Sequence, residues 1–214
     1  MGDPASRLND VRNGIAAACK LGRRMPEDIA LIAVTKGRSA EEIEPLIAAG
    51  QLDFGENRVQ EAAAKWPALR QRYPDVRLHM IGQLQSNKAE EAVSLFDAIH
   101  SLDRPSLLTA LVKAGKPVPA YVQVNIGAEG QKGGLAVDAL GPFLDEVRSS
   151  PLPLAGLMCI PPADRQPGPY FALLAELARR HDVTGLSMGM SADYRIAVMM
   201  GATAVRVGSA LFED

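Results

Sequence analysis

The sequence is poor in the features that mark disulfide-stapled, metal-binding, membrane-spanning and nucleic-acid-binding proteins. Two cysteines, Cys19 and Cys159, form neither a disulfide framework nor a metal-binding spacing, and three scattered histidines form no ligand motif, so we expect no metal and a reducing, cytoplasmic location. No apolar stretch approaches the roughly 20 residues that span a bilayer. The net charge of -2 gives no support for a nucleic-acid-binding surface, which requires clustered basic residues.

Targeting signals are equally scarce. No apolar segment precedes a cleavage site, so we expect no secretory leader. The start, Met1 to Ser6, formally fits an N-myristoylation pattern, but no second membrane signal follows, and we interpret the match as chance or as a cloning remnant. With 214 residues, 47% of them hydrophobic and 22% charged, the chain is long enough for one substantial core, and we expect a single domain over residues 1–214.

Short apolar runs alternate with helical patterns along the chain. An amphipathic helix is predicted over residues 5–22, with Leu8, Val11 and Ile15 on its apolar face and Gly22 at its end. Strands are then predicted at 29–35, 52–54, 77–81, 98–101, 120–126, 154–159, 185–188 and 203–207. Helices are predicted between them near 40–49, 57–72, 87–94, 105–115, 136–149, 169–180 and 192–200.

This alternation of strand and helix predicts a parallel sheet covered by helices. Eight strands favour closure into a (β/α)8 TIM barrel with an extra N-terminal helix, and about 200 residues suffice for a compact example. An open doubly wound sheet is the alternative, which is weakened because no Gly-x-Gly-x-x-Gly turn follows the first strand.

Boundary signals support these elements. Ser39 followed by Glu42 is a capping box for the helix at 40–49. Ser191 is the predicted N-cap of the helix at 192–200. Glycines fall where three helices should end, at Gly50, Gly115 and Gly201.

Lys36 closes the first predicted strand with a lone amine. Active sites of barrels lie at the C-terminal ends of the strands, where Lys36 falls. Apolar neighbours in the strand would disfavour the charged form of the amine, and a neutral amine attacks aldehydes to form a Schiff base. Most lysines are merely solvated, so position alone leaves both interpretations open.

Two late loops are candidates for binding phosphate. Segment 187–191 follows the seventh strand and Gly208-Ser209 follows the eighth, and the free N–H groups of the helices that they open suit an anion. Each loop could equally be an ordinary capped turn. Arg206, inside the last strand, needs a partner, either a nearby carboxylate or an acceptor atom of a ligand. Combined with Lys36, these loops suit an aldehyde that carries a phosphate.

Three further polar positions carry weaker signals. Glu56 and Asn57 follow the second strand, where they either cap the next helix or reach the barrel mouth. His79 is interpreted as a hydrogen-bonded core histidine rather than as a ligand-binding residue. Segment 85–88 is either a solvated helix start or a loop that faces a ligand.

Six ordered blocks along almost the whole chain carry a resemblance to a known family. They are 33–36 (Ala-Val-Thr-Lys), 54–61, 79–88, 156–158, 186–191 with Asp193, and 205–212. On these blocks the chain resembles the pyridoxal-phosphate homeostasis family, the YggS/PROSC-type proteins that bind pyridoxal 5′-phosphate (PLP). The family is linked to vitamin B6 and amino-acid homeostasis and has no well-established catalytic activity.

The resemblance implies a single-domain barrel like the N-terminal domain of alanine racemase, with PLP as its cofactor and PLP-dependent apoenzymes as partners to consider. The residues that it implies for PLP are Lys36 as the Schiff-base lysine, Arg206 at the pyridine nitrogen, Ser191, Gly208 and Ser209 at the phosphate, and Asn57 and Met190 along the pocket. Gln83 and Ser209 stand where the family often has proline and threonine. The chain stops at Asp214, so the last helix is expected to be short or missing.

An arginine at the pyridine nitrogen argues for binding rather than catalysis. PLP withdraws electrons most strongly when that nitrogen is protonated, and an arginine is a permanent donor that favours the unprotonated form. Alanine racemases complete the site with a second acid/base group from a further domain and a partner subunit, for which this chain has no room. We therefore expect a monomeric PLP-binding protein. A weak amino-acid racemase or lyase is the alternative, and a sugar-phosphate aldolase that uses Lys36 is a third hypothesis.

Overall fold

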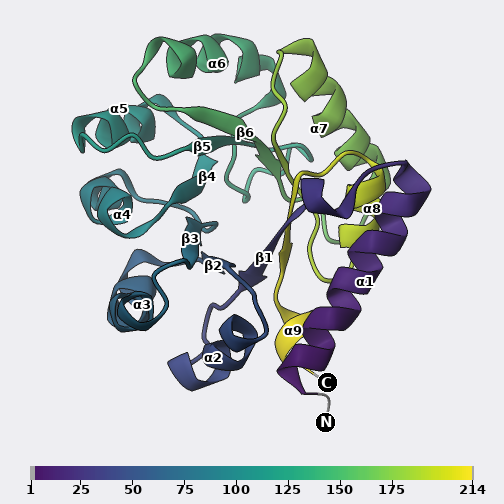
Figure 1. Cartoon of the computed structure of the whole chain (residues 1–214). Helices are drawn as coiled ribbons and strands as arrows, with labels where there is room; N and C mark the ends of the chain where they lie inside the picture. The colour runs from purple at the N-terminus through teal and green to yellow at the C-terminus, as the bar shows by residue number, and fades with distance from the viewer. Residues whose placement is uncertain (1–2, 214) are drawn as a thin grey trace.

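The computed structural model describes residues 3–213. The start of the myristoylation-like pattern, at Met1 and Gly2, lies outside the described residues, as does Asp214 at the end of the expected domain. Eight parallel strands close into a barrel in the order β1 to β8 (Figure 1). The predicted (β/α)8 barrel is confirmed and the open sheet is excluded, because β1 pairs with β8. The strands are β1 (Ala30–Val34), β2 (Asp53–Glu56), β3 (Arg77–Met80), β4 (Ala98–Leu102), β5 (Ala120–Val124), β6 (Leu154–Cys159), β7 (Leu186–Ser187) and β8 (Ala204–Val207).

Helices surround the barrel (Figure 1). They are α1 (Pro4–Gly22), α2 (Ala40–Ala48), α3 (Val59–Arg72), α4 (Ala89–Leu95), α5 (Pro105–Lys113), α6 (Leu140–Ser149), α7 (Gly168–Arg180), α8 (Tyr194–Met199) and α9 (Ser209–Phe212). The last helix is short, as expected. Among residues 3–213, no helix combines the length and the apolar character needed to cross a membrane.

The predicted N-terminal helix is confirmed as α1, and its apolar face is buried. Leu8, Val11 and Ile15 expose at most 4% of their surface. Figure 1 shows α1 running along α8 and α9, which flank β8, so the first and last helices of the chain are neighbours. Gly22 is the last residue of α1, but the left-handed cap that follows is Arg23, with a φ of 53°.

The strands are buried because helices cover the outside of the barrel and side chains fill its interior. Every residue of β2, β4 and β8 is buried, as expected for strands that are covered on both faces. These strands also bury polar side chains, among them Glu56, His100 and Arg206. β7 has two residues, fewer than the four predicted, and the chain turns after it at Gly189, which has a φ of 95°.

Most of the predicted boundary signals are confirmed. The Ser39 hydroxyl accepts the Glu42 N–H at 3.4 Å, and the Glu42 carboxylate accepts the Ser39 N–H at 2.8 Å. The predicted helix-ending glycines all have positive φ, as a left-handed cap requires. The prediction for Ser191 is wrong, because Asp193 occupies the N-cap position of α8.

Candidate functional site

The C-terminal ends of β1 and β8 lie side by side at one rim of the barrel. Ala33 pairs with Val207, and a Cβ placed on Gly208 would lie 3.3 Å from the Cβ of Val34. Lys36 follows Val34 by two residues. Segments from near the beginning and near the end of the sequence therefore meet at the rim where barrel proteins carry their sites.

Lys36 itself is exposed at this rim rather than enclosed by apolar side chains. It lies in the turn after β1, one residue beyond the buried Thr35, so the expectation that strand neighbours desolvate its amine is wrong. Within residues 3–213 its side chain makes no hydrogen bond or ion pair. The amine is therefore available to a ligand.

The backbone on both sides of Lys36 is held by two residues of α3. The Lys65 ammonium donates to the carbonyl oxygens of Thr35 and Arg38, at 2.8 and 3.0 Å. The Glu61 carboxylate accepts the N–H of Gly37 at 2.5 Å. These contacts fix the position of the loop while leaving the amine of Lys36 free.

A buried carboxylate, Glu56, holds Lys65 in place. Glu56 is fully buried and pairs with Lys65 at 2.8 Å. Its Oε1 also accepts hydrogen bonds from the Thr35 hydroxyl at 2.6 Å and from the Trp66 indole at 2.9 Å. Glu56 therefore neither caps α3, whose N-cap is Arg58, nor faces a ligand as the sequence had suggested.

The turn after β8 gathers backbone N–H groups around one oxygen. The Ser191 hydroxyl accepts hydrogen bonds from the N–H groups of Gly208 at 3.2 Å and Ala210 at 3.3 Å. Ser191 therefore joins the loop after β7 to the turn after β8 and does not cap its own helix. Ser209 is exposed beside it. α8 and α9 are too short for a strong helix dipole, so the local N–H groups are the anion-binding feature of this turn.

Met190 lies on the same rim, in the loop between β7 and α8. Its N–H donates to the Asp193 carboxylate at 2.6 Å, and its side chain is 38% exposed. The preceding residue, Gly189, accepts the N–H of Arg206 at 2.9 Å. The loop after β7 is thereby tied to β8.

Asn57 lies on the other side of Lys36, just after β2. Val34 pairs with Gly55, so continuing the register by two residues sets Asn57 beside Lys36. Asn57 packs closely on Gly82, where an added Cβ would lie 2.2 Å from the Asn57 carbonyl oxygen. Of the seven residues predicted for the site, Arg206 lies in β8 and the other six lie on the rim of the barrel where the strands end.

Arg206 is the buried member of this group, with 4% of its surface exposed. Its partners are not the carboxylate considered from the sequence. Its guanidinium donates to the Ser187 hydroxyl at 2.6 Å and to the Cys159 carbonyl oxygen at 2.9 Å. Burial lowers the pKa of Arg206. An arginine nevertheless stays protonated in proteins, and these two bonds leave other N–H donors of its five for a ligand.

Several residues that shape the site were not found from the sequence. Lys65 and Glu61 look like any charged pair on an exposed helix, so the sequence holds no signal for their contacts with the Lys36 loop. Ser187 and His100 do carry a signal, because a polar side chain inside a predicted buried strand needs a partner.

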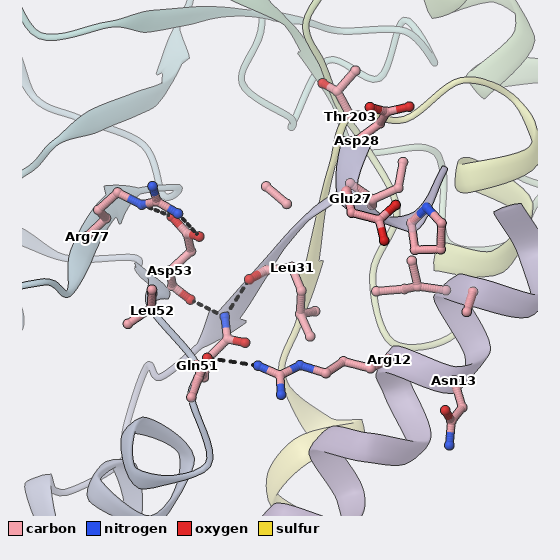
Figure 2. Close-up of a pocket in the computed structure, with 16 residues that line it drawn as sticks. Arg12, Asn13, Glu27, Asp28, Leu31, Gln51, Leu52, Asp53, Arg77 and Thr203 are labelled. Atoms are coloured by element: carbon pink, nitrogen blue, oxygen red, sulfur yellow. Dashed lines mark hydrogen bonds and ion pairs between the residues drawn. The ribbon is translucent and has the colours of Figure 1, made fainter. Parts of the chain in front are cut away.

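A cavity of about 830 Å³ opens at the opposite end of the barrel, where the strands begin. Figure 2 shows that its polar groups are largely satisfied by one another: Arg77 pairs with Asp53, and Gln51 donates to the carbonyl oxygens of Leu31 and Asp53. Arg12 donates to the carbonyl oxygen of Gly50. Its size alone does not make it the candidate site, because Lys36 and Gly208 lie at the other rim.

The fold is a single barrel of the alanine racemase type. Alanine racemase from Corynebacterium glutamicum superposes with a TM-score of 0.66 over 94% of this chain and 60% of that one, and its 18% identity supports the fold alone. No family model matches the sequence.

Curated relatives identify the family. The chain is 35% identical to the pyridoxal phosphate homeostasis protein of Escherichia coli K12, covering 99% of this chain and 97% of the relative. It is 36% identical to the protein of the same name from Synechocystis, over 89% and 93%. PipY of Synechococcus elongatus, solved with PLP bound, has a TM-score of 0.81 and 38% identity over 92% of this chain and 99% of that one. The chain belongs to the pyridoxal phosphate homeostasis protein family.

Proposed function

We propose that this protein binds PLP at the C-terminal rim of its barrel, through a Schiff base on Lys36, and serves intracellular PLP homeostasis. The observation that carries the proposal is the meeting of a free amine with an anion-binding turn across the β1–β8 seam. Relatives with the same family name and the PLP-bound structure of PipY support it.

The residues of the rim fit the three reactive parts of PLP. The N–H groups of Gly208 and Ala210 already converge on an oxygen, that of Ser191, so they suit a phosphate oxygen, with Ser209 next to them. Arg206 suits the pyridine nitrogen as a donor. Lys36 supplies the amine for the aldehyde, and Asn57 and Met190 would border the ring.

Binding rather than catalysis is the function that this set of groups supports. When bound, PLP supplies an electron-withdrawing ring and a reactive aldehyde. A permanent donor at Arg206 favours the unprotonated ring nitrogen and so weakens electron withdrawal. Lys36 attaches the cofactor reversibly, and the β8 turn holds the phosphate. These steps suffice for storing and releasing PLP.

The test is a PLP titration followed by borohydride reduction. Wild-type protein should develop a visible absorbance band that reduction removes, and the reduced protein should keep the cofactor mass on the peptide that contains Lys36. Lys36→Ala should lose both signals, whereas Lys113→Ala, on the outer helix α5, should keep them. A reducible covalent adduct in Lys36→Ala would refute the assignment. Rapid exchange of amino-acid α-protons with deuterated water would favour the racemase or lyase alternative instead.

We also propose that residues 1–214 form one domain, that the protein is a monomer, and that it works in the cytoplasm and passes PLP to apoenzymes. Both cysteines are buried free thiols, which suits a reducing compartment.

The oligomeric state and the transfer of PLP need separate experiments. Light scattering on the protein as it elutes from a gel-filtration column gives its mass in solution, which should be that of a monomer. Activation of an apoenzyme by the loaded protein, faster than by the same concentration of free PLP, tests the transfer.

A further inference from the structure

A hydrogen-bonded chain of buried side chains crosses the barrel from Arg206. Its guanidinium donates to the hydroxyl of Ser187 at 2.6 Å, and that hydroxyl lies 2.8 Å from Nδ1 of His100. Nε2 of His100 lies 3.0 Å from Nδ1 of His79, whose Nε2 lies 2.9 Å from the carboxylate of Asp53. These five residues come from β8, β7, β4, β3 and β2, and we refer to them as the relay.

The relay ends at the cavity on the opposite side of the barrel. Asp53 and Arg77 are the first residues of β2 and β3, and the Arg77 guanidinium bonds the Asp53 carboxylate through Nε at 2.7 Å and Nη2 at 2.6 Å (Figure 2). Between the two ends, His100 and Ser187 are fully buried. The ring of His100 also stacks on Tyr121, with the ring centroids 4.2 Å apart.

The two ends fix the direction of every hydrogen bond in the relay. Arg206 can only donate, so the Ser187 oxygen accepts from it and the Ser187 O–H is left to donate to Nδ1 of His100. His100 must then carry its proton on Nε2 and donate to Nδ1 of His79. His79 in turn carries its proton on Nε2 and donates to the ionised Asp53.

The opposite direction leaves a buried group unpaired. If His100 donated to Ser187, that hydroxyl would accept from two donors, and its own hydrogen would have no acceptor among the described residues. A buried donor without a partner costs free energy that a paired one does not. Burial keeps the pKa of His100 well below its usual value, which agrees with a neutral ring.

We propose that Ser187 and His100, oriented through His79 by Asp53, are positioning residues that fix the guanidinium of Arg206 as the donor toward the pyridine nitrogen of PLP. The inference rests on the proposed PLP site. Because the Ser187 hydrogen is committed to His100, its lone pairs face Arg206, and the directed chain strengthens that contact. A barrel core needs no such chain for stability alone, since apolar side chains of the same shape would fill the space.

The tautomers of the two histidines give a test that needs no mutation. In nitrogen-15 NMR spectra of the wild-type protein loaded with PLP, both His79 and His100 should carry a proton on Nε2 and none on Nδ1. A proton on Nδ1 of either ring, or a positively charged His100 near neutral pH, would overturn the direction of the relay and with it the proposal.

Three variants test the effect on PLP. Ser187→Ala removes the acceptor of Arg206, and His100→Phe breaks the chain while keeping a ring to stack on Tyr121. Each should weaken PLP binding about tenfold and shift the absorbance maximum of bound PLP. Ser187→Thr keeps a hydroxyl that both accepts and donates, so it should restore both properties.

Ser101→Ala is the matched control. Ser101 is buried on the same strand as His100, and its hydroxyl has no partner among the described residues, so its loss should change neither affinity nor spectrum. Wild-type affinity and spectrum in folded Ser187→Ala and His100→Phe would refute the proposal, as would an equal loss in Ser101→Ala. Absence of PLP binding, or of its dependence on Lys36, in the wild-type protein would instead show that the proposed function is wrong.

Discussion

At the scale of single residues, the proposed site combines an exposed cation with a buried one whose position is fixed by two hydrogen bonds. Lys36 is exposed and unpaired within the described residues, so its amine can react. Arg206 is buried and oriented by Ser187 and by the carbonyl oxygen of Cys159. The first suits a reversible covalent attachment, and the second suits a fixed hydrogen bond to a ring nitrogen.

Burial of neutral His100 predicts a pH dependence of stability. The pKa of His100 is lowered well below 6.5, chiefly by burial. Below about pH 6.5 the unfolded chain gains a proton that the folded chain does not, so stability that is present at higher pH is lost as the pH falls toward the folded pKa.

Urea unfolding at pH 7.5, 6.5 and 5.5 checks this dependence. The slope attributable to His100 is at most about 1.4 kcal/mol per pH unit. The free energy of unfolding should fall more steeply with decreasing pH in the wild type than in His100→Phe, because the variant lacks the buried ring whose pKa is lowered by folding. Parallel curves for the two proteins would mean that His100 takes up its proton equally well in the folded state.

At the scale of elements, α3 positions the loop that carries Lys36. Lys65 pairs with buried Glu56 and binds two carbonyl oxygens of the loop. Lys65→Met should leave the Glu56 carboxylate buried without its cation, which costs roughly 3–5 kcal/mol. The fluorescence of Trp66, the only tryptophan, reports urea unfolding next to this pair. Lys113→Met, at an exposed position of α5, is the control, and equal stability of the two variants would contradict the role of Lys65.

The turn after β8 supplies a second prediction at this scale. A Cβ on Gly208 would lie 3.3 Å from that of Val34, a tight contact beside the N–H groups that we assign to the phosphate. The φ of Gly208 is -119°, which other residues also adopt, so Gly208→Ala should still fold.

Gly208→Ala should bind PLP about tenfold more weakly, while its affinity for pyridoxal without the phosphate changes little. Gly130→Ala is the matched control, because a Cβ there meets no atom within 4 Å. An equal loss of affinity for PLP and for pyridoxal would show that the added methyl group disturbs binding of the pyridine ring rather than binding of the phosphate.

At the scale of the whole molecule, α1 joins the two ends of the chain. It packs along α8 and α9, the helices on either side of β8, and so supports the seam where β8 meets β1 (Figure 1). Leu8→Ala, at a fully buried position, should lower the free energy of unfolding by about 2–5 kcal/mol. Leu21→Ala on the same helix, at a position 76% exposed, should change it by less than about 0.5 kcal/mol in urea titrations. Equal effects would mean that α1 contributes little to the fold.

The barrel could be predicted because the apolar runs and the helix boundary signals in the sequence match the strands and helices of the structure. Apolar runs become strands within a few residues of their predicted limits, and the capping box at Ser39 forms as expected. Lys36 and Gly208 could be placed on one rim because parallel strands in a barrel present their C-terminal ends together.

Contacts between distant segments could not be predicted. Ser191 precedes a helix and has the chemistry of an N-cap, yet its hydroxyl bonds the turn after β8, which tertiary packing brings within reach. Lys36 is exposed because β1 ends two residues before it, and strand ends are not fixed by apolar pattern alone. The relay needs five strands in register, which no local pattern reveals.

The most direct test of the central claim is a crystal structure of the protein with PLP. Electron density should run continuously from the Nζ of Lys36 to the aldehyde carbon of PLP. The phosphate should accept hydrogen bonds from the N–H groups of Gly208 and Ala210, with Ser191 and Ser209 beside it, and Arg206 should face the ring nitrogen. PLP attached to another lysine, or lodged in the cavity at the opposite end of the barrel, would contradict the account.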